Sequence, residues 1–213
     1  MKNVNTLILA ISISLFGCMK SQISDSLVVQ ANEKQFSMAT VLAVEFDAED
    51  LAECVENGLK RNFPKLKFIS GEKFRDTFYP WFEPNTAPDG IAELSAILSK
   101  TLVRKRIEAL GIELLIYVHG DTHQSVLHGD VGGYGVAVGY AAAERETHIS
   151  TTVWDLRKMA LVGDTDVHFQ GTVHIPVIGI PFVIPAFTES SACSETTKRI
   201  SNCLTGEVSH KDK

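Results

Sequence analysis

Three short apolar runs, separated by two amphipathic helix patterns, constrain the fold of this 213-residue chain most strongly. Residues 39–46 (ATVLAVEF) and 112–118 (IELLIYV) are nearly continuous apolar runs, which are typical of strands buried on both faces. Residues 66–70 are expected to form a short strand between them. Between them, apolar residues recur every three or four positions, over residues 51–63 and again over residues 91–102, as in helices with one buried face. The order strand, helix, strand, helix, strand predicts an α/β sheet with helices packed against it.

The second half of the chain predicts antiparallel strands. Residues 144–154 alternate between two faces and residues 160–173 return after a turn that contains Asp155, which is typical of a half-exposed hairpin. A last helix pattern follows at residues 189–204. The predicted fold class is therefore α/β with a mixed (α+β) sheet, in which the first five elements are followed by an antiparallel hairpin and a C-terminal helix.

The start of the chain has the composition of an export signal. Lys2 precedes an apolar run at residues 6–16, which at about 1.5 Å per residue is too short to cross a bilayer core of about 30 Å. The run ends in Leu-Phe-Gly-Cys at residues 15–18, which resembles the lipobox of bacterial lipoproteins. The resemblance implies cleavage after Gly17 and lipid on Cys18; the alternative is an ordinary signal peptide with a chance cysteine.

This resemblance implies an anatomy for the whole chain. A residue other than aspartate after the lipidated cysteine, here Met19, implies an outer-membrane anchor that faces the periplasm. We expect a signal peptide at residues 1–17, a lipidated tether at 18–38, a single α/β domain at 39–204 and a polar tail at 205–213.

Composition narrows the range of partners. The net charge is −6 and becomes −7 once residues 1–17, which contain one lysine and no acid, are removed. An acidic chain without a basic cluster argues against binding of nucleic acid, or of anionic lipid through a charged face. No motif for a cofactor or for nucleophilic catalysis is present, so we expect no cofactor and no enzyme activity.

Three further cysteines follow Cys18 and would meet an oxidising compartment. Cys193 and Cys203 share the predicted last helix, where ten residues separate them by about 15 Å, beyond disulfide reach. A bridge within the molecule should then involve Cys54, and we favour Cys54 with Cys193. The alternative is three buried thiols.

One polar cluster could carry chemistry. His119, Asp121 and His123 alternate along a predicted strand, so they share one face, with His128 and Asp130 close behind. Two imidazoles and a carboxylate could hold zinc. The spacing matches no established metal motif, and the pattern favours solvated histidines at the end of a strand.

Residues 173–187 (VHIPVIGIPFVIPAF), which we call the proline-rich segment, are strongly apolar but contain three prolines. A regular helix or a central strand is therefore not expected there. If it is exposed, it forms an apolar patch of the kind that marks interfaces; the alternative is that it completes the core. The aromatic residues Tyr79, Trp81 and Phe82 pose the same choice. The candidate partner loop consists of Ile175, Pro176, Val177, Ile178, Ile180, Pro181, Phe182, Val183 and Ile184.

Several stretches together resemble the α/β domain of certain envelope lipoproteins. These are the lipid anchor, ATVLAVEF, IELLIYVHG, a glycine-rich hairpin that leads to ETHISTTVWDL, and the final cysteine-bearing helix. Proteins of this kind include the curli-secretion lipoprotein, the penicillin-binding-protein activator lipoproteins and the amino-terminal domain of TolB. The aromatic block FRDTFYPWFEP resembles uncharacterised lipoproteins instead.

The resemblance implies a non-catalytic binding or assembly factor for envelope proteins, whose contact surfaces are the proline-rich segment and the glycine hairpin. The alternatives are a metal-binding protein or metal-dependent enzyme using His119, Asp121 and His123, and a self-assembling structural subunit. The expected partners are the membrane, through the lipid anchor, and an envelope protein or a second copy of the chain.

Overall fold

The computed structural model describes residues 20–27, 36–43, 48–83, 85–125, 128–132, 138–178, 180–181 and 187–206. Within the strands, the side chains of residues 25–27, 128–132, 138–141 and 174–181 are not described. The predicted signal peptide, Cys18 and the tail from residue 207 lie outside the described residues.

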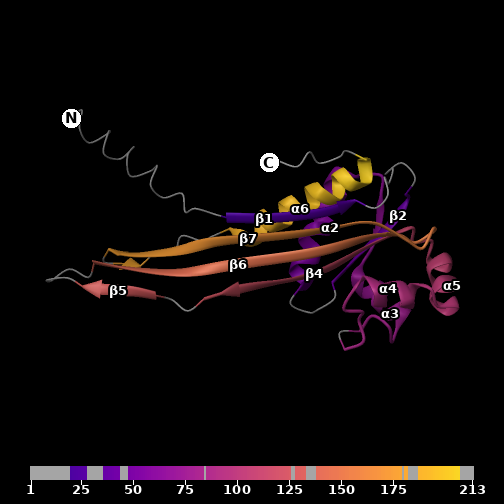
Figure 1. Cartoon of the computed structure of the whole chain (residues 1–213), viewed down its shortest axis with the longest axis horizontal. Helices are drawn as coiled ribbons and strands as arrows, with labels where there is room; N and C mark the ends of the chain where they lie inside the picture. The colour runs from indigo at the N-terminus through magenta and orange to yellow at the C-terminus, as the bar shows by residue number, and fades with distance from the viewer. Residues whose placement is uncertain are drawn as a thin grey trace.

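One mixed sheet forms the centre of the molecule (Figure 1). Its strand order is β1-β7-β6-β4-β2-β3, with β5 paired to β6 and β8 paired to β7. The pairs β2–β3 and β2–β4 are parallel and all the other pairs are antiparallel. The strands are β1 (Lys20–Leu27), β2 (Met38–Ala43), β3 (Lys67–Ile69), β4 (Leu114–Gln124), β5 (His128–Gly132), β6 (Val138–Asp155), β7 (Ala160–Ile178) and β8 (Ile180–Pro181).

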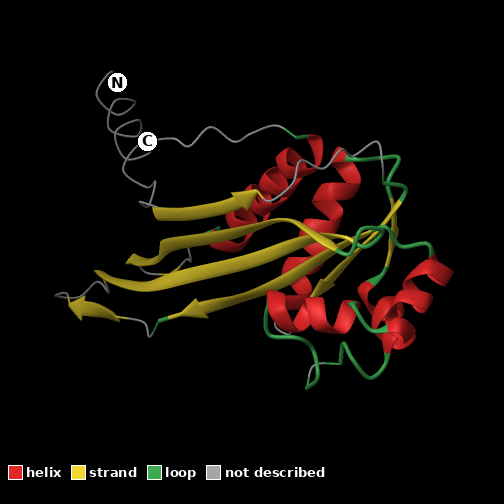
Figure 2. Cartoon of the chain, turned by 45° about the vertical axis from the view of Figure 1, so that its right-hand side comes forward, coloured by secondary structure: helices red, strands yellow, loops and turns green. Residues whose placement is uncertain are grey.

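Helices cover the two faces of the sheet unequally (Figure 2). On one face, α2 (Glu49–Asn62) and α6 (Thr188–Thr205) pack over β2, β4, β6 and β7 and form the larger core. On the other face, α3 (Gly71–Phe78), α4 (Ile91–Leu98) and α5 (Thr101–Leu110) cover only one end, where Leu115, Tyr117 and Trp154 join the second core. The rest of that face has no helix over it among the described residues.

The predicted fold class is confirmed: after β1, parallel strands and helices are followed by an antiparallel hairpin and a C-terminal helix. The stripe of α2 is buried as expected, with Leu51, Val55 and Leu59 at most 6% exposed. The hairpin turn forms after Asp155, whose carboxylate accepts hydrogen bonds from the backbone N–H groups of Arg157 and Lys158.

Two elements differ from the sequence prediction near the second helix. The pattern at residues 91–102 predicts one helix, but α4 ends at Leu98 and α5 begins at Thr101, with Lys100 extended between them. The aromatic block, for which no helix was predicted, begins with α3, and its residues Phe74 and Phe78 are fully buried. A break of two residues leaves the apolar period almost unchanged, so periodicity alone does not reveal it.

The predicted tether is also wrong over part of its length. Lys20–Leu27 forms β1, paired in register with β7 from Gln170 to Gly163. An edge strand needs only backbone hydrogen bonds and one partly covered side chain. Ile23 lies opposite the buried Val167 and is 37% exposed. The polar composition of residues 20–27 therefore gives no pattern from which the strand could be predicted.

The proline-rich segment was not expected to form a regular helix or a central strand, and its first part forms an edge strand. β7 continues through Pro176 to Ile178, and Pro176 lies opposite Tyr140 of β6. β1 pairs with β7 only as far as Gln170, and β8 pairs with it only at Val177 and Ile178. At Pro176 the strand therefore has one described neighbour, where a missing N–H is tolerated.

Candidate functional site: the polar face of the sheet

The uncovered part of the sheet carries a dense set of imidazoles and carboxylates. Alternation places them on the same side as Leu115 and Tyr117, beyond the end of the second core. We call this surface the polar face. It consists of His119, Asp121 and His123 on β4, Glu146 and His148 on β6, and Asp166 and His168 on β7.

Strand register brings these side chains together from distant parts of the chain. Asp121 lies directly opposite His148, and His148 lies opposite His168. The sequence pattern had identified only the three residues on β4. The histidines and acids of β6 and β7 were missed because register is set by long-range pairing, although their alternation in residues 144–154 was visible.

Imidazole–carboxylate pairs link the three strands. His123 Nε2 lies 2.6 Å from Asp121 Oδ2, and His148 Nε2 lies 2.8 Å from Asp166 Oδ2. His148 Nδ1 lies 3.9 Å from Asp121 Oδ1, so this ring bridges two carboxylates. His168 Nε2 lies 3.9 Å from Glu146 Oε2. Most of these side chains are about 40% exposed, and His123 is 81% exposed.

The residues named for the metal-site alternative make other contacts in the structure. His119 packs its ring against Tyr117, with centroids 5.3 Å apart, while Asp121 is paired with His123 and His148. Among the described residues, no three histidine, cysteine or carboxylate side chains are arranged to hold a metal ion. His128 and Asp130 belong to β5, where side chains are not described.

Packing from the opposite face holds this surface in place. Gly120, between His119 and Asp121, carries no Cβ; one built there would lie 2.7 Å from the carbonyl oxygen of His148 and 2.9 Å from Leu51 of α2. The close approach of β4, β6 and α2 therefore requires glycine at this position. The polar face is thus carried by tightly packed strands.

Tyr117 marks the boundary between the second core and the polar face. Its side chain is 1% exposed, and its hydroxyl donates a hydrogen bond of 3.1 Å to the carbonyl oxygen of Pro88. Burial, with the nearby charges of Asp89 and Glu93 adding to it, raises the pKa of Tyr117 well above its usual range. The phenol is therefore a neutral donor.

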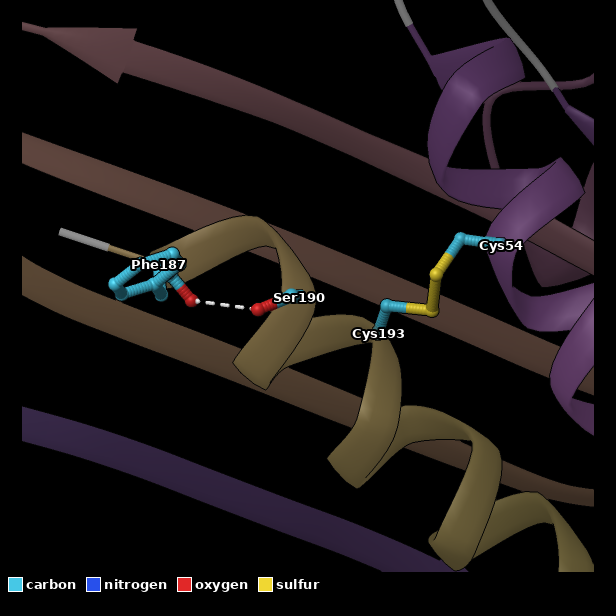
Figure 3. The surroundings of a disulfide bond; sticks show 4 residues. All are labelled: Cys54, Phe187, Ser190 and Cys193. Carbon is cyan, nitrogen blue, oxygen red and sulfur yellow. Dashed lines mark hydrogen bonds between the residues drawn. A yellow bond between two sulfur atoms is a disulfide. The ribbon is translucent and has the colours of Figure 1, made fainter. Parts of the chain in front are cut away.

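A disulfide joins the two helices on the opposite face (Figure 3). It connects Cys54 of α2 with Cys193 of α6, the pair that the sequence analysis favoured, at a Cα–Cα distance of 6.2 Å. Cys203 is not part of this bridge and is of intermediate exposure. At the start of α6, Ser190 Oγ donates to the carbonyl oxygen of Phe187. Phe187 is 67% exposed.

The other predicted interface residues separate into three groups. Of the candidate partner loop, Ile175–Ile178 lie in β7 and Ile180–Pro181 form β8, while residues 182–184 lie outside the described part. Phe82 is a core residue at 1% exposed. The Arg106 guanidinium carbon lies over the Trp81 ring, 5.4 Å from the centroid of that ring, and Tyr79 is 65% exposed.

No helix in the described ranges is long and apolar enough to span a membrane.

Comparisons with known proteins match the fold only distantly. No family model and no curated protein sequence matches the chain. A solved PelC dodecamer from Paraburkholderia phytofirmans has a TM-score of 0.42 and 8% identity, over 90% of this chain and 100% of that one. Lipoprotein GNA1162 from Neisseria meningitidis has a TM-score of 0.33 and 12% identity, over 78% and 99%. A neuraminyllactose-binding hemagglutinin homolog from Helicobacter pylori has a TM-score of 0.33 and 10% identity, over 86% and 88%.

Proposed function

We propose that the chain is an envelope lipoprotein, anchored by lipid on Cys18 in the outer membrane and facing the periplasm, whose domain binds other envelope proteins without catalysing a reaction. The observation that carries the binding role is the polar face, a broad sheet surface that no described helix covers. Its imidazoles and carboxylates pair with one another across three strands and stay partly exposed.

The compartment is supported by two independent features. Residues 1–18 resemble the export signal of a lipoprotein. The Cys54–Cys193 bridge is of a kind that persists in oxidising compartments and is rare in reducing ones. A lipoprotein of the periplasm meets both conditions. The disulfide therefore supports the localisation by an argument that does not use the signal peptide.

The chemistry of the polar face favours a protein partner with a basic surface. Three of its seven residues are carboxylates, and Asp164 extends the same face of β7 beyond Asp166. Carboxylates accept hydrogen bonds and pair with arginine in a fixed geometry, and charged rims steer association with surfaces of opposite sign. We expect the partner to present arginine or lysine to this face.

Site-specific photocrosslinking in intact cells tests this role. A photoreactive residue in place of His123 or Asp166 should give one dominant adduct with another envelope protein. The matched control is Glu53, exposed on α2 on the opposite side of the sheet, which should not give it. An adduct only with a second copy of the chain would replace this proposal with self-assembly. Equal yields from Glu53, or no adduct from the polar face, would contradict it.

A further inference from the structure

The start of β1 fixes how far the domain can lie from its anchor. Cys18 precedes Lys20, the first residue of β1, by two positions. At about 3.3 Å per residue, two residues reach about 7 Å. A lipid on Cys18 therefore holds the sheet directly against the membrane, because the tether predicted from the sequence begins as a strand. This step rests on the lipidation in the proposed function.

β6 and β7 extend beyond Lys20, in the direction in which the chain leads back to Cys18. Lys20 lies opposite Gln170 of β7, which lies opposite Glu146 of β6. β7 runs on to Ile178 and β6 begins as far out as Val138, an extension of about 26 Å at 3.3 Å per residue. Figure 1 shows β5, β6 and β7 projecting beyond the start of β1, away from α3, α4 and α5.

This extension, which we call the arm, differs in composition from the rest of the sheet. The arm consists of β5 (His128–Gly132), residues 138–143 of β6 (VGYAAA) and residues 173–178 of β7 (VHIPVI). The β6 and β7 parts contain no aspartate, glutamate, lysine or arginine, and β5 contributes one carboxylate, Asp130, which lies opposite Tyr140. The charges return at its base, where Arg145 forms an ion pair of 2.6 Å with Glu189 of α6. The polar face lies wholly on the other side of this base.

We infer that the arm is a lipid-binding element that inserts its apolar strands into the interfacial region of the bilayer. The occupant is lipid because the anchor at Cys18 enters the sheet within about 7 Å of the base of the arm. Apolar segments held at the membrane surface enter the headgroup and acyl boundary, and tyrosine, here Tyr140, is favoured at that depth. The polar face then lies beyond the base of the arm, farther from the membrane, where protein partners can reach it.

Quenching by brominated lipid tests the inference. The full lipidated chain is placed in phosphatidylcholine vesicles with or without bromine on the acyl chains. In the variant Tyr140→Trp, the added fluorescence should fall by more than half in brominated vesicles. The control Leu102→Trp puts the probe at an exposed position of α5, far from the arm, and should not be quenched. The native Trp81 and Trp154 lie at that same far end and set the background.

A second variant and a mass measurement separate failure of the arm inference from failure of folding or of lipidation. Ile178→Trp, at the end of β7, repeats the test should Tyr140→Trp not fold, as judged by its circular dichroism. The intact mass of the same sample shows whether Cys18 carries acyl chains. An acylated chain whose arm tryptophan is unquenched overturns the arm inference and leaves the anchor standing. A chain without acyl groups overturns the proposed function itself.

Discussion

At the scale of single residues, Tyr117 shows how a buried polar atom is satisfied. Its hydroxyl reaches the Pro88 carbonyl oxygen across a separation of 29 residues and ties the loop before α4 to the centre of the sheet. Its ring also contacts Phe82 and His119. The residue therefore connects the aromatic core to the first histidine of the polar face.

Tyr117→Phe should lower the free energy of unfolding by about 1–2 kcal/mol, because the buried Pro88 carbonyl loses its donor. The pKa of Tyr117 is raised in the folded state, whereas the unfolded phenol ionises near its ordinary value of about 10. Its contribution is then complete below pH 10 and is lost above it, so the difference between wild type and variant should narrow at alkaline pH. Urea unfolding measures both effects. The exposed Tyr79→Phe is the control, and an equal loss from it would refute the account.

At the scale of elements, the Cys54–Cys193 bridge connects two helices that flank the sheet in sequence order. It closes a separation of 139 residues and joins α2 to α6 over the larger core. Contact between these helices is close elsewhere too, because a Cβ at Gly58 of α2 would lie 2.6 Å from the Thr197 side chain of α6. The two helices therefore form one covering layer.

Replacing both Cys54 and Cys193 by alanine should reduce the free energy of unfolding by about 2–5 kcal/mol, because a long loop of the unfolded chain is no longer closed. Cys203→Ala should change it by far less. Unfolding by urea gives the energies, and thiol titration gives the pairing: the unfolded, unreduced lipidated chain should show one reactive thiol. Three reactive thiols would rule out the bridge.

The elements that could be predicted from the sequence are those whose burial is periodic. The sequence pattern predicts the strands β2 and β4 and the helices α2 and α6, because one face or both faces of each are apolar over many residues. β1 could not be predicted, because its stability comes from backbone pairing with a strand about 140 residues later. The site was predictable only on β4; His148 and His168 become neighbours of Asp121 through register, which depends on the whole sheet.

At the scale of the whole molecule, the proposed functions occupy different parts of one sheet. Helices cover one face and only one end of the other face (Figure 2). By strand register, the polar face lies between that covered end and the arm. β1 enters beside the base of the arm. With the lipid on Cys18, this order would place the arm at the bilayer and the polar face in the periplasm, so the anchor determines the orientation of everything else.

The intact mass of the mature protein from membranes therefore tests the central claim most directly. We expect a chain that begins at Cys18 and carries a diacylglycerol and an amide-linked acyl chain on that residue, and we expect Cys18→Ala to leave the precursor uncleaved and without lipid. A mature chain that begins at any other residue, or one that begins at Cys18 without acyl groups, would contradict the anchor and with it the orientation of the domain.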